Sequence, residues 1–160
     1  MSVADPRMVA VVDIDGVVAD VRHRLHHVTG RPKDWPAFFA AAADDGLLGE
    51  GEHTVRALAA VYDIVYLSGR LRRVTGDWLA RHGLPAGELR LRPHADFRPS
   101  SDFKVEALRA IAATRTVVVL VDDDLRVLDA ARAAGFDVLP AAWMGEHSAL
   151  REAQERDGRT

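Results

Sequence analysis

Two aspartates separated by one residue follow an apolar run near the start of the sequence. Residues 9–12 read Val-Ala-Val-Val, and Asp13, Ile14, Asp15 and Gly16 come directly after them. The run is typical of a buried parallel strand, and the glycine permits a sharp turn at its carboxyl end. Two carboxylates this close repel each other unless a cation or a shared proton compensates their charge. The pattern therefore predicts a site for a cation or for proton transfer.

Three further groups with suitable chemistry accompany later apolar runs. Ser68 follows the run 63–67, Asp122 and Asp123 follow the run 116–121, and Lys104 opens the helical segment before that second run. Carboxylates without histidine or cysteine partners favour a hard cation, most simply Mg²⁺. A hydroxyl and an ammonium group beside such a cation suit the oxygens of a phosphoryl group.

The elements that must position these residues alternate along the chain. Strands are predicted over 8–13, 63–67, 89–92, 116–121 and 137–140, and helices over 52–61, 71–82, 103–113 and 125–134. Such alternation favours an α/β fold, a doubly wound, Rossmann-like parallel sheet of five strands with helices on both faces. Because ligands bind at the carboxyl edge of such sheets, the acidic residues, Ser68 and Lys104 are expected to share one rim.

Composition limits the other possibilities. The sequence has 160 residues, a net charge of −3 and no cysteine, which excludes disulfides, thiolate metal sites and a cysteine nucleophile. We expect one domain over 1–145 with an irregular insert at about 20–50, in which 36–44 forms a short helix, and a polar tail over 146–160. We expect neither a membrane span nor a signal peptide, so the predicted location is the cytoplasm. An oligomer is compatible with the sequence.

The order of these motifs resembles the haloacid dehalogenase-like phosphohydrolases. The shared elements are Asp-x-Asp-Gly after the first strand, a serine after the second, a lysine, and an acidic pair after the fourth. The resemblance implies that Asp13 is a nucleophile that forms an aspartyl-phosphate and that Asp15 is the general acid and base. It also implies that Ser68 and Lys104 hold phosphoryl oxygens. Mg²⁺ would be held by Asp13, by the backbone carbonyl of Asp15 and by Asp123, with Asp122 as a further ligand or as an orienting group.

Several details are similar to the phosphatase domain of polynucleotide kinases in particular. They are the doubled Asp122-Asp123, the segment Leu67-Ser68-Gly69-Arg70, and an aspartate–arginine segment over 96–99 shortly before the lysine. Asp124 departs from the arginine often found after the acidic pair, and we expect it to cap the following helix. Large cap domains are usual in this superfamily, but here the insert is short and 76–89 leaves no room for a second cap. We therefore expect a small or absent cap and an open site.

The predicted function is therefore that of a Mg²⁺-dependent phosphomonoesterase acting on a nucleotide or a polynucleotide 3′-phosphate. The expected substrate contacts are Ser68, Gly69, Arg70, Lys104, Arg22, Arg24 and Arg98. Basic residues within the insert would contact neighbouring phosphates and make binding dependent on salt.

Other interpretations remain open. The substrate could be another small phosphorylated metabolite, and the chain could instead be a phosphoacceptor domain or a silent phosphate-binding or metal-binding module. His23, His26 and His27 could be metal ligands or surface residues. The aromatic residues over 35–39 could stack on a base or pack the insert onto the core.

Overall fold

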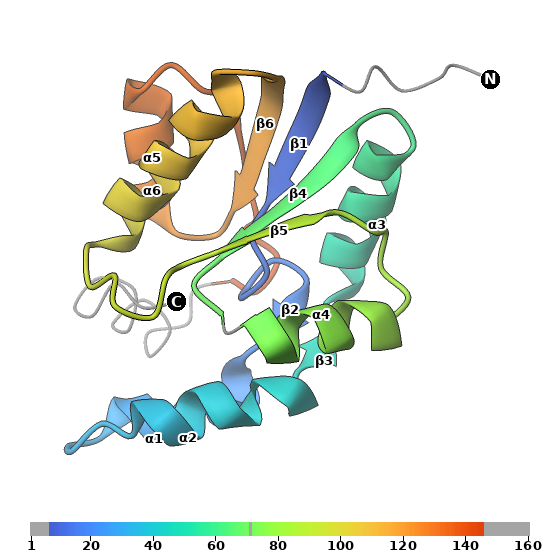
Figure 1. Ribbon diagram of the computed structural model, residues 1–160. Coiled ribbons are helices and arrows are strands. Elements are labelled where there is room, and N and C mark those ends of the chain that lie inside the picture. Colours follow the sequence, from blue (N-terminus) through green and yellow to red (C-terminus); the bar gives the residue numbers. More distant parts are fainter. Residues whose placement is uncertain (1–6, 71, 146–160) are drawn as a thin grey trace.

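The computed structural model describes residues 7–70 and 72–145, and its centre is a five-stranded parallel sheet (Figure 1). The strands are β1 (Met8–Val12), β4 (Asp63–Ser68), β5 (Glu88–Leu91), β6 (Thr116–Asp122) and β7 (Val138–Pro140). Their order in the sheet is β5-β4-β1-β6-β7 and every pair is parallel. The predicted doubly wound, Rossmann-like α/β fold is confirmed.

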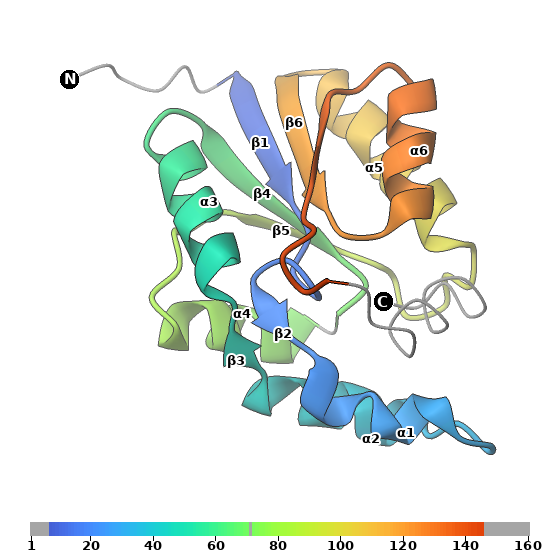
Figure 2. The ribbon, with the colours of Figure 1, turned by 180° about the vertical axis from the view of Figure 1, so that it is seen from behind.

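Helices cover both faces of the sheet because alternate side chains of each strand point to opposite sides. Val9 and Val11 of β1 pack in one core with α5 (Ser100–Ala112) and α6 (Leu125–Ala133). Ala10 and Val12 pack in the other core, with side chains of α3 (Gly49–Ala59) and α4 (Arg72–Arg81). Figures 1 and 2 show these two helix pairs on opposite sides of the sheet.

The insert is more regular than the sequence predicts. It contains β2 (Ala19–Asp20), η1 (Arg22–Arg24), α1 (His26–Thr29), α2 (Trp35–Ala40), η2 (Ala41–Asp44) and β3 (Gly46–Leu47). β2 and β3 pair antiparallel, and the helices lie beyond the carboxyl ends of the sheet strands (Figure 2). Of the glycine and proline residues that favour an irregular segment, Gly30 and Pro32 lie between α1 and α2, whereas Pro36 lies in the first turn of α2 and Gly46 lies in β3.

A small apolar core of its own holds the insert together. Its fully or almost fully buried members are Val21, Leu25, Val28 and Phe38, against which Trp35, Phe39 and Met144 pack. The ring of Phe38 meets those of Trp35 and Phe39 edge to face. Phe38 is therefore a packing residue, but it packs within the insert's own core and not onto the cores of the sheet.

Helix α3 begins earlier than expected, at Gly49, and includes Gly51 as a contact residue. A Cβ atom at Gly51 would lie 1.8 Å from the carbonyl oxygen of Val17, so only glycine lets the helix approach that loop. The predicted polar tail over 146–160 lies outside the described residues. Within 7–70 and 72–145, no helix has the length and apolar character needed to cross a membrane.

Candidate active site

The carboxyl ends of the three central strands bring the predicted polar residues together. Asp13 directly follows β1, Ser68 is the last residue of β4, and Asp122 is the last residue of β6. Val12 of β1 is in register with Tyr66 of β4 and with Val121 of β6. The three polar residues therefore lie at one level of the sheet edge.

A buried lysine neutralises two of the acids. The Nζ atom of Lys104, from the first turns of α5, lies 2.6 Å from Oδ2 of Asp122 and 3.1 Å from Oδ1 of Asp13. All three side chains are almost completely shielded from solvent. Burial raises the pKa of the Asp13 carboxyl well above its ordinary value; Lys104 opposes this rise, and the neighbouring carboxylates add to it. Burial also lowers the pKa of Lys104, but the attraction of Asp122 and Asp13 outweighs it and raises that pKa overall.

An acidic cluster at this edge fits a hard divalent cation. Asp13, Asp122 and Asp123 each offer an oxygen, and these oxygens lie within 4.8 Å of one another. The Oδ1 atom of Asp13 is buried and accepts no hydrogen bond of good geometry from the described residues, so it retains its capacity as a ligand. Both oxygens of Asp122 accept hydrogen bonds, from Lys104 and from the backbone N–H of Asp124. Asp122 thus orients Lys104, and it could also contribute an oxygen ligand to the cation.

The turn after β1 requires glycine where it passes the acidic cluster. Gly16 has a φ angle of +77°, and a Cβ atom there would lie 2.1 Å from Oδ2 of Asp123. The Asp-x-Asp-Gly motif therefore has two functions in this structure, since it supplies two carboxylates and leaves room for a third, that of Asp123 directly after β6. Asp124 caps α6, accepting a hydrogen bond from the backbone N–H of Arg126 as expected.

Two arginines hold the second carboxylate of the motif. The Oδ1 atom of Asp15 lies 3.0 Å from Nη2 of Arg24 and 3.3 Å from Nη1 of Arg70. Burial by itself raises the pKa of Asp15, but the two guanidinium charges outweigh burial and leave that pKa below its ordinary value. Asp15 is therefore ionised at neutral pH in the free protein.

A residue that the sequence analysis did not single out, Asp45 of the insert, completes this network. It is buried and accepts hydrogen bonds from Nε of Arg24 at 2.8 Å and from Nη1 of Arg70 at 3.2 Å. Its backbone oxygen accepts a further hydrogen bond from Nε1 of Trp78 in α4. Asp45 thus ties the insert to the residues around Asp15.

Of the other residues predicted to contact the substrate, Ser68 lies beside the network around Asp15, whereas Arg22 and Arg98 lie outside it. Oγ of the buried Ser68 accepts a hydrogen bond from the backbone N–H of Arg70, across Gly69. Arg22 pairs with Asp20 on the surface of the insert. Arg98 pairs with Asp96 and Glu106 beside α5.

The expectation for Arg24 requires a correction. The sequence predicts that Arg24, like the other basic residues of the insert, contacts substrate phosphates, but its side chain is fully buried and its guanidinium group is directed at Asp15 and Asp45. The histidines of the insert form no metal cluster within the described residues; His23 contacts Asp45, and Nδ1 of His26 contacts a backbone oxygen.

This fold, with Asp-x-Asp at the end of β1 and an acidic pair at the end of β6, defines the class of haloacid dehalogenase-like hydrolases. A haloacid dehalogenase-like hydrolase from Streptococcus pneumoniae has 15% identity and a TM-score of 0.63, covering 91% of this chain and 90% of that one. The hydrolase YfnB from Bacillus subtilis, solved with magnesium bound, has 10% identity and a TM-score of 0.59, covering 84% of this chain and 88% of that one.

The family is narrower than this class. Residues 7–143 match the polynucleotide kinase PNKP phosphatase domain, and the chain belongs to that family. A chain of the Pnkp1/Rnl/Hen1 RNA repair complex has 23% identity and a TM-score of 0.67 over 87% of this chain. The chain spans only 44% of the length of that relative. No curated protein matches the sequence. The fold is accordingly that of a phosphatase domain of the haloacid dehalogenase type.

Proposed function

We propose that this domain hydrolyses phosphate monoesters through an aspartyl-phosphate and that its substrate is the 3′-phosphate of a polynucleotide. The observation that carries the chemistry is the contrast between the two carboxylates of the motif. Asp13 lies beside one lysine and the acidic cluster, whereas Asp15 is held by two arginines. Such separation of environments is typical of a pair with different catalytic roles.

In the proposed first step, a carboxylate oxygen of Asp13 attacks phosphorus, and the bond to the leaving oxygen breaks as Asp15 donates a proton to that oxygen. Asp15 must therefore gain a proton when substrate binds, and the negative charge of a bound phosphate raises its pKa in that direction. In the second step, Asp15 removes a proton from water, which attacks phosphorus and releases Asp13.

In this proposal Ser68 and Lys104 bind the non-bridging oxygens of the phosphoryl group. Asp13, Asp123 and the backbone carbonyl of Asp15 would hold Mg²⁺, with Asp122 beside them. The cation would supply charge neutralisation for the phosphoryl oxygens. Lys104 and the metal ion would together offset the negative charges of the substrate and of the nucleophile Asp13.

The substrate class is inferred from family membership and from the small size of the insert. The segment between α4 and β5 has only six residues, 82–87, and leaves no room for a second cap. An open rim admits the end of a long molecule more readily than a closed chamber does. The similarity to a chain of an RNA repair complex supports the same class.

A phosphate-release panel tests this proposal. The domain with Mg²⁺ would be assayed on oligonucleotides with a 3′-phosphate, on the same oligonucleotides with a 5′-phosphate, on nucleoside monophosphates and on sugar phosphates. We expect the highest kcat/KM on the 3′-phosphorylated oligonucleotides. Equal or higher values on sugar phosphates would overturn the substrate class while leaving the chemistry intact.

A further inference from the structure

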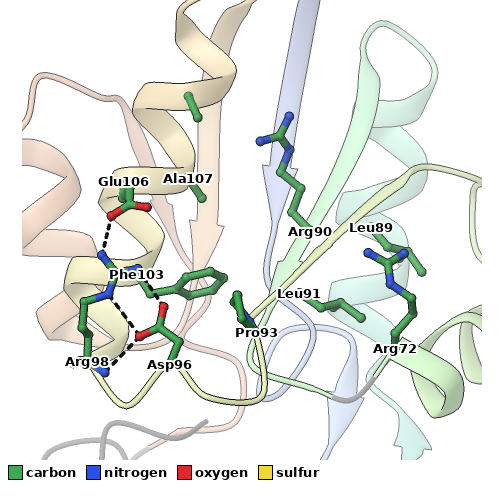
Figure 3. Close-up of a pocket in the computed structure, with 11 residues that line it drawn as sticks. Arg72, Leu89, Arg90, Leu91, Pro93, Asp96, Arg98, Phe103, Glu106 and Ala107 are labelled. Carbon is green, nitrogen blue, oxygen red and sulfur yellow. Dashed lines mark hydrogen bonds and ion pairs between the residues drawn. The ribbon is translucent and has the colours of Figure 1, made fainter.

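A groove at the edge of the sheet is not used by the chemistry described above. It lies between the edge strand β5 and helix α5 and has a volume of about 360 Å³. Figure 3 shows Leu91, Arg90 and Arg72 on one side of it and Phe103 on the other, with Pro93 between them. Asp96, Arg98 and Glu106 also line the Phe103 side, where they pair with one another. The groove thus offers an apolar floor, a wall with two arginines on the β5 and α4 side, and a wall of paired charges on the α5 side.

The groove begins next to the residues that are expected to hold the phosphoryl group. Leu91 of β5 is in register with Ser68, and the backbone N–H of Arg92 donates to the carbonyl oxygen of Ser68 at 3.0 Å. On the other side, Phe103 directly precedes Lys104 in α5. A chain whose terminal phosphate lies at Ser68 and Lys104 therefore has the groove within reach of its adjoining units.

The cations of this region differ in how far they are already neutralised. Arg98 makes a two-pronged contact with Asp96 and a second contact with Glu106, so its charge is satisfied within the fold. Among the described residues, Arg90 pairs with Glu88, which is partly exposed and also pairs with Arg115. Arg72 is exposed and makes no ion pair within the described residues. Positive charge is thus left over on the β5 and α4 side, the complement of a phosphate backbone.

The loop between β5 and α5 presents an aromatic ring to solvent. Phe97 is 74% exposed, the largest value among the exposed large apolar residues of the described chain. The loop around it is held in shape, because Arg92 donates to the carbonyl oxygen of Arg98 at 3.0 Å and to Oγ of Ser100 at 2.8 Å. A ring held at the surface by a braced loop can stack on a base without further ordering.

We propose that this groove binds the nucleotides that precede the terminal phosphate of a single-stranded polynucleotide. A base stacks on Phe97, which stands in the sequence between the lining residues Asp96 and Arg98, and the backbone phosphates contact Arg72 and Arg90. This inference rests on the proposed function, since it requires a polynucleotide at the site.

Binding measurements on the whole domain test the groove independently of turnover. The probe is a fluorescein-labelled ten-nucleotide DNA strand with a 3′-phosphate, and the readout is anisotropy as a function of salt. Phe97→Ala is expected to weaken binding about tenfold, as for the loss of one base–aromatic stack. Arg72→Ala is expected to reduce the slope of log K against log salt by about 0.7, the value for one contact with a single-strand phosphate.

Matched controls show whether the loss of binding is specific to the groove or follows from the loss of any exposed apolar or basic side chain. Val61→Ala removes another exposed apolar side chain, and Arg132→Ala removes an exposed arginine of α6. Both controls are expected to bind as the wild type does. Phe97→Trp and Arg72→Lys are expected to retain binding and salt slope, respectively.

A kinetic comparison completes the test. Phe97→Ala should raise KM for the ten-nucleotide substrate and leave the hydrolysis of a nucleoside 3′-monophosphate unchanged. If Phe97→Ala and Arg72→Ala both bind and hydrolyse like the wild type, the groove assignment is overturned and the proposed function stands. If the wild type hydrolyses no 3′-phosphorylated substrate and does not bind the strand, the proposed function fails as well.

Discussion

Replacement of Arg24 by methionine tests the buried network around Asp15 most severely. Arg24 is fully buried, donates two hydrogen bonds to Asp45 and one to Asp15, and lies 4.2 Å from the ring centre of Phe38. The substitution leaves two buried carboxylates with Arg70 as their remaining close cation in this network. Removal of one partner from a buried ion pair destabilises a protein by about 3–5 kcal/mol. For a domain of this length, the expected fall in Tm is about 6–20 °C.

The pH dependence of the loss gives a second readout with a defined sign. Burial already raises the pKa of Asp45, and the loss of Arg24 raises that pKa further. A carboxyl whose pKa in the folded state lies above its unfolded value contributes stability at low pH, which is lost as the pH rises through the folded value. The stability difference between the variant and the wild type should therefore shrink as the pH falls from neutral to acidic values.

The assay is urea denaturation of both proteins across this pH range, with Arg22→Met as the matched control. Arg22 stands two positions away and pairs with Asp20 at the surface. Such an exposed pair is worth about 0–1 kcal/mol. If Arg24→Met costs no more than Arg22→Met at neutral pH, the reasoning about the buried network is wrong.

Three further predictions concern single residues. Lys104→Met should lower kcat about 100-fold or more, as for the loss of a group that stabilises developing charge; phosphate-release assays check this, and a loss below tenfold would contradict the role of Lys104. Gly16→Ala should lower the free energy of unfolding by about 1–2 kcal/mol from its φ angle alone. It should also weaken Mg²⁺ binding, because the new Cβ atom displaces Asp123. An unchanged Mg²⁺ affinity by calorimetry would argue against that contact. Burial raises the pKa of Tyr66 to about 12 from 10.0, and its hydroxyl donates to Pro85, so its contribution to stability is complete below about pH 10 and is lost as the pH rises through about 12. Denaturation at alkaline pH should show a steeper loss for the wild type than for Tyr66→Phe, and parallel curves would refute this.

The sequence was informative where local pattern determines structure. The apolar runs 63–67 and 116–121 predict β4 and β6 to within a residue, since buried parallel strands require such runs. The position of Ser68 and Asp122 at one edge then follows from topology. The short helices of the insert are harder to predict, because they are shorter than the windows over which helical periodicity can be recognised.

The electrostatic network could not be read from the sequence because its members come from separate segments. Asp45 and Arg70 are 25 residues apart, and only the docking of the insert brings them together. Arg24 did leave a signal. At helical spacing it shares one face with three apolar residues, Val21, Leu25 and Val28. All four side chains are buried. An arginine within such an apolar face is more readily explained as a buried partner for acids than as a surface contact.

The central claim, covalent catalysis by Asp13 with Asp15 as proton carrier, is tested most directly by a burst experiment. The Asp15→Asn variant would be mixed with 4-nitrophenyl phosphate and Mg²⁺, because this leaving group departs without protonation. The account predicts a rapid release of one equivalent of nitrophenol per protein, followed by slow turnover as the phosphoenzyme accumulates, and no release from Asp13→Asn. A burst that persists in Asp13→Asn, or a linear time course with full turnover in Asp15→Asn, would contradict it.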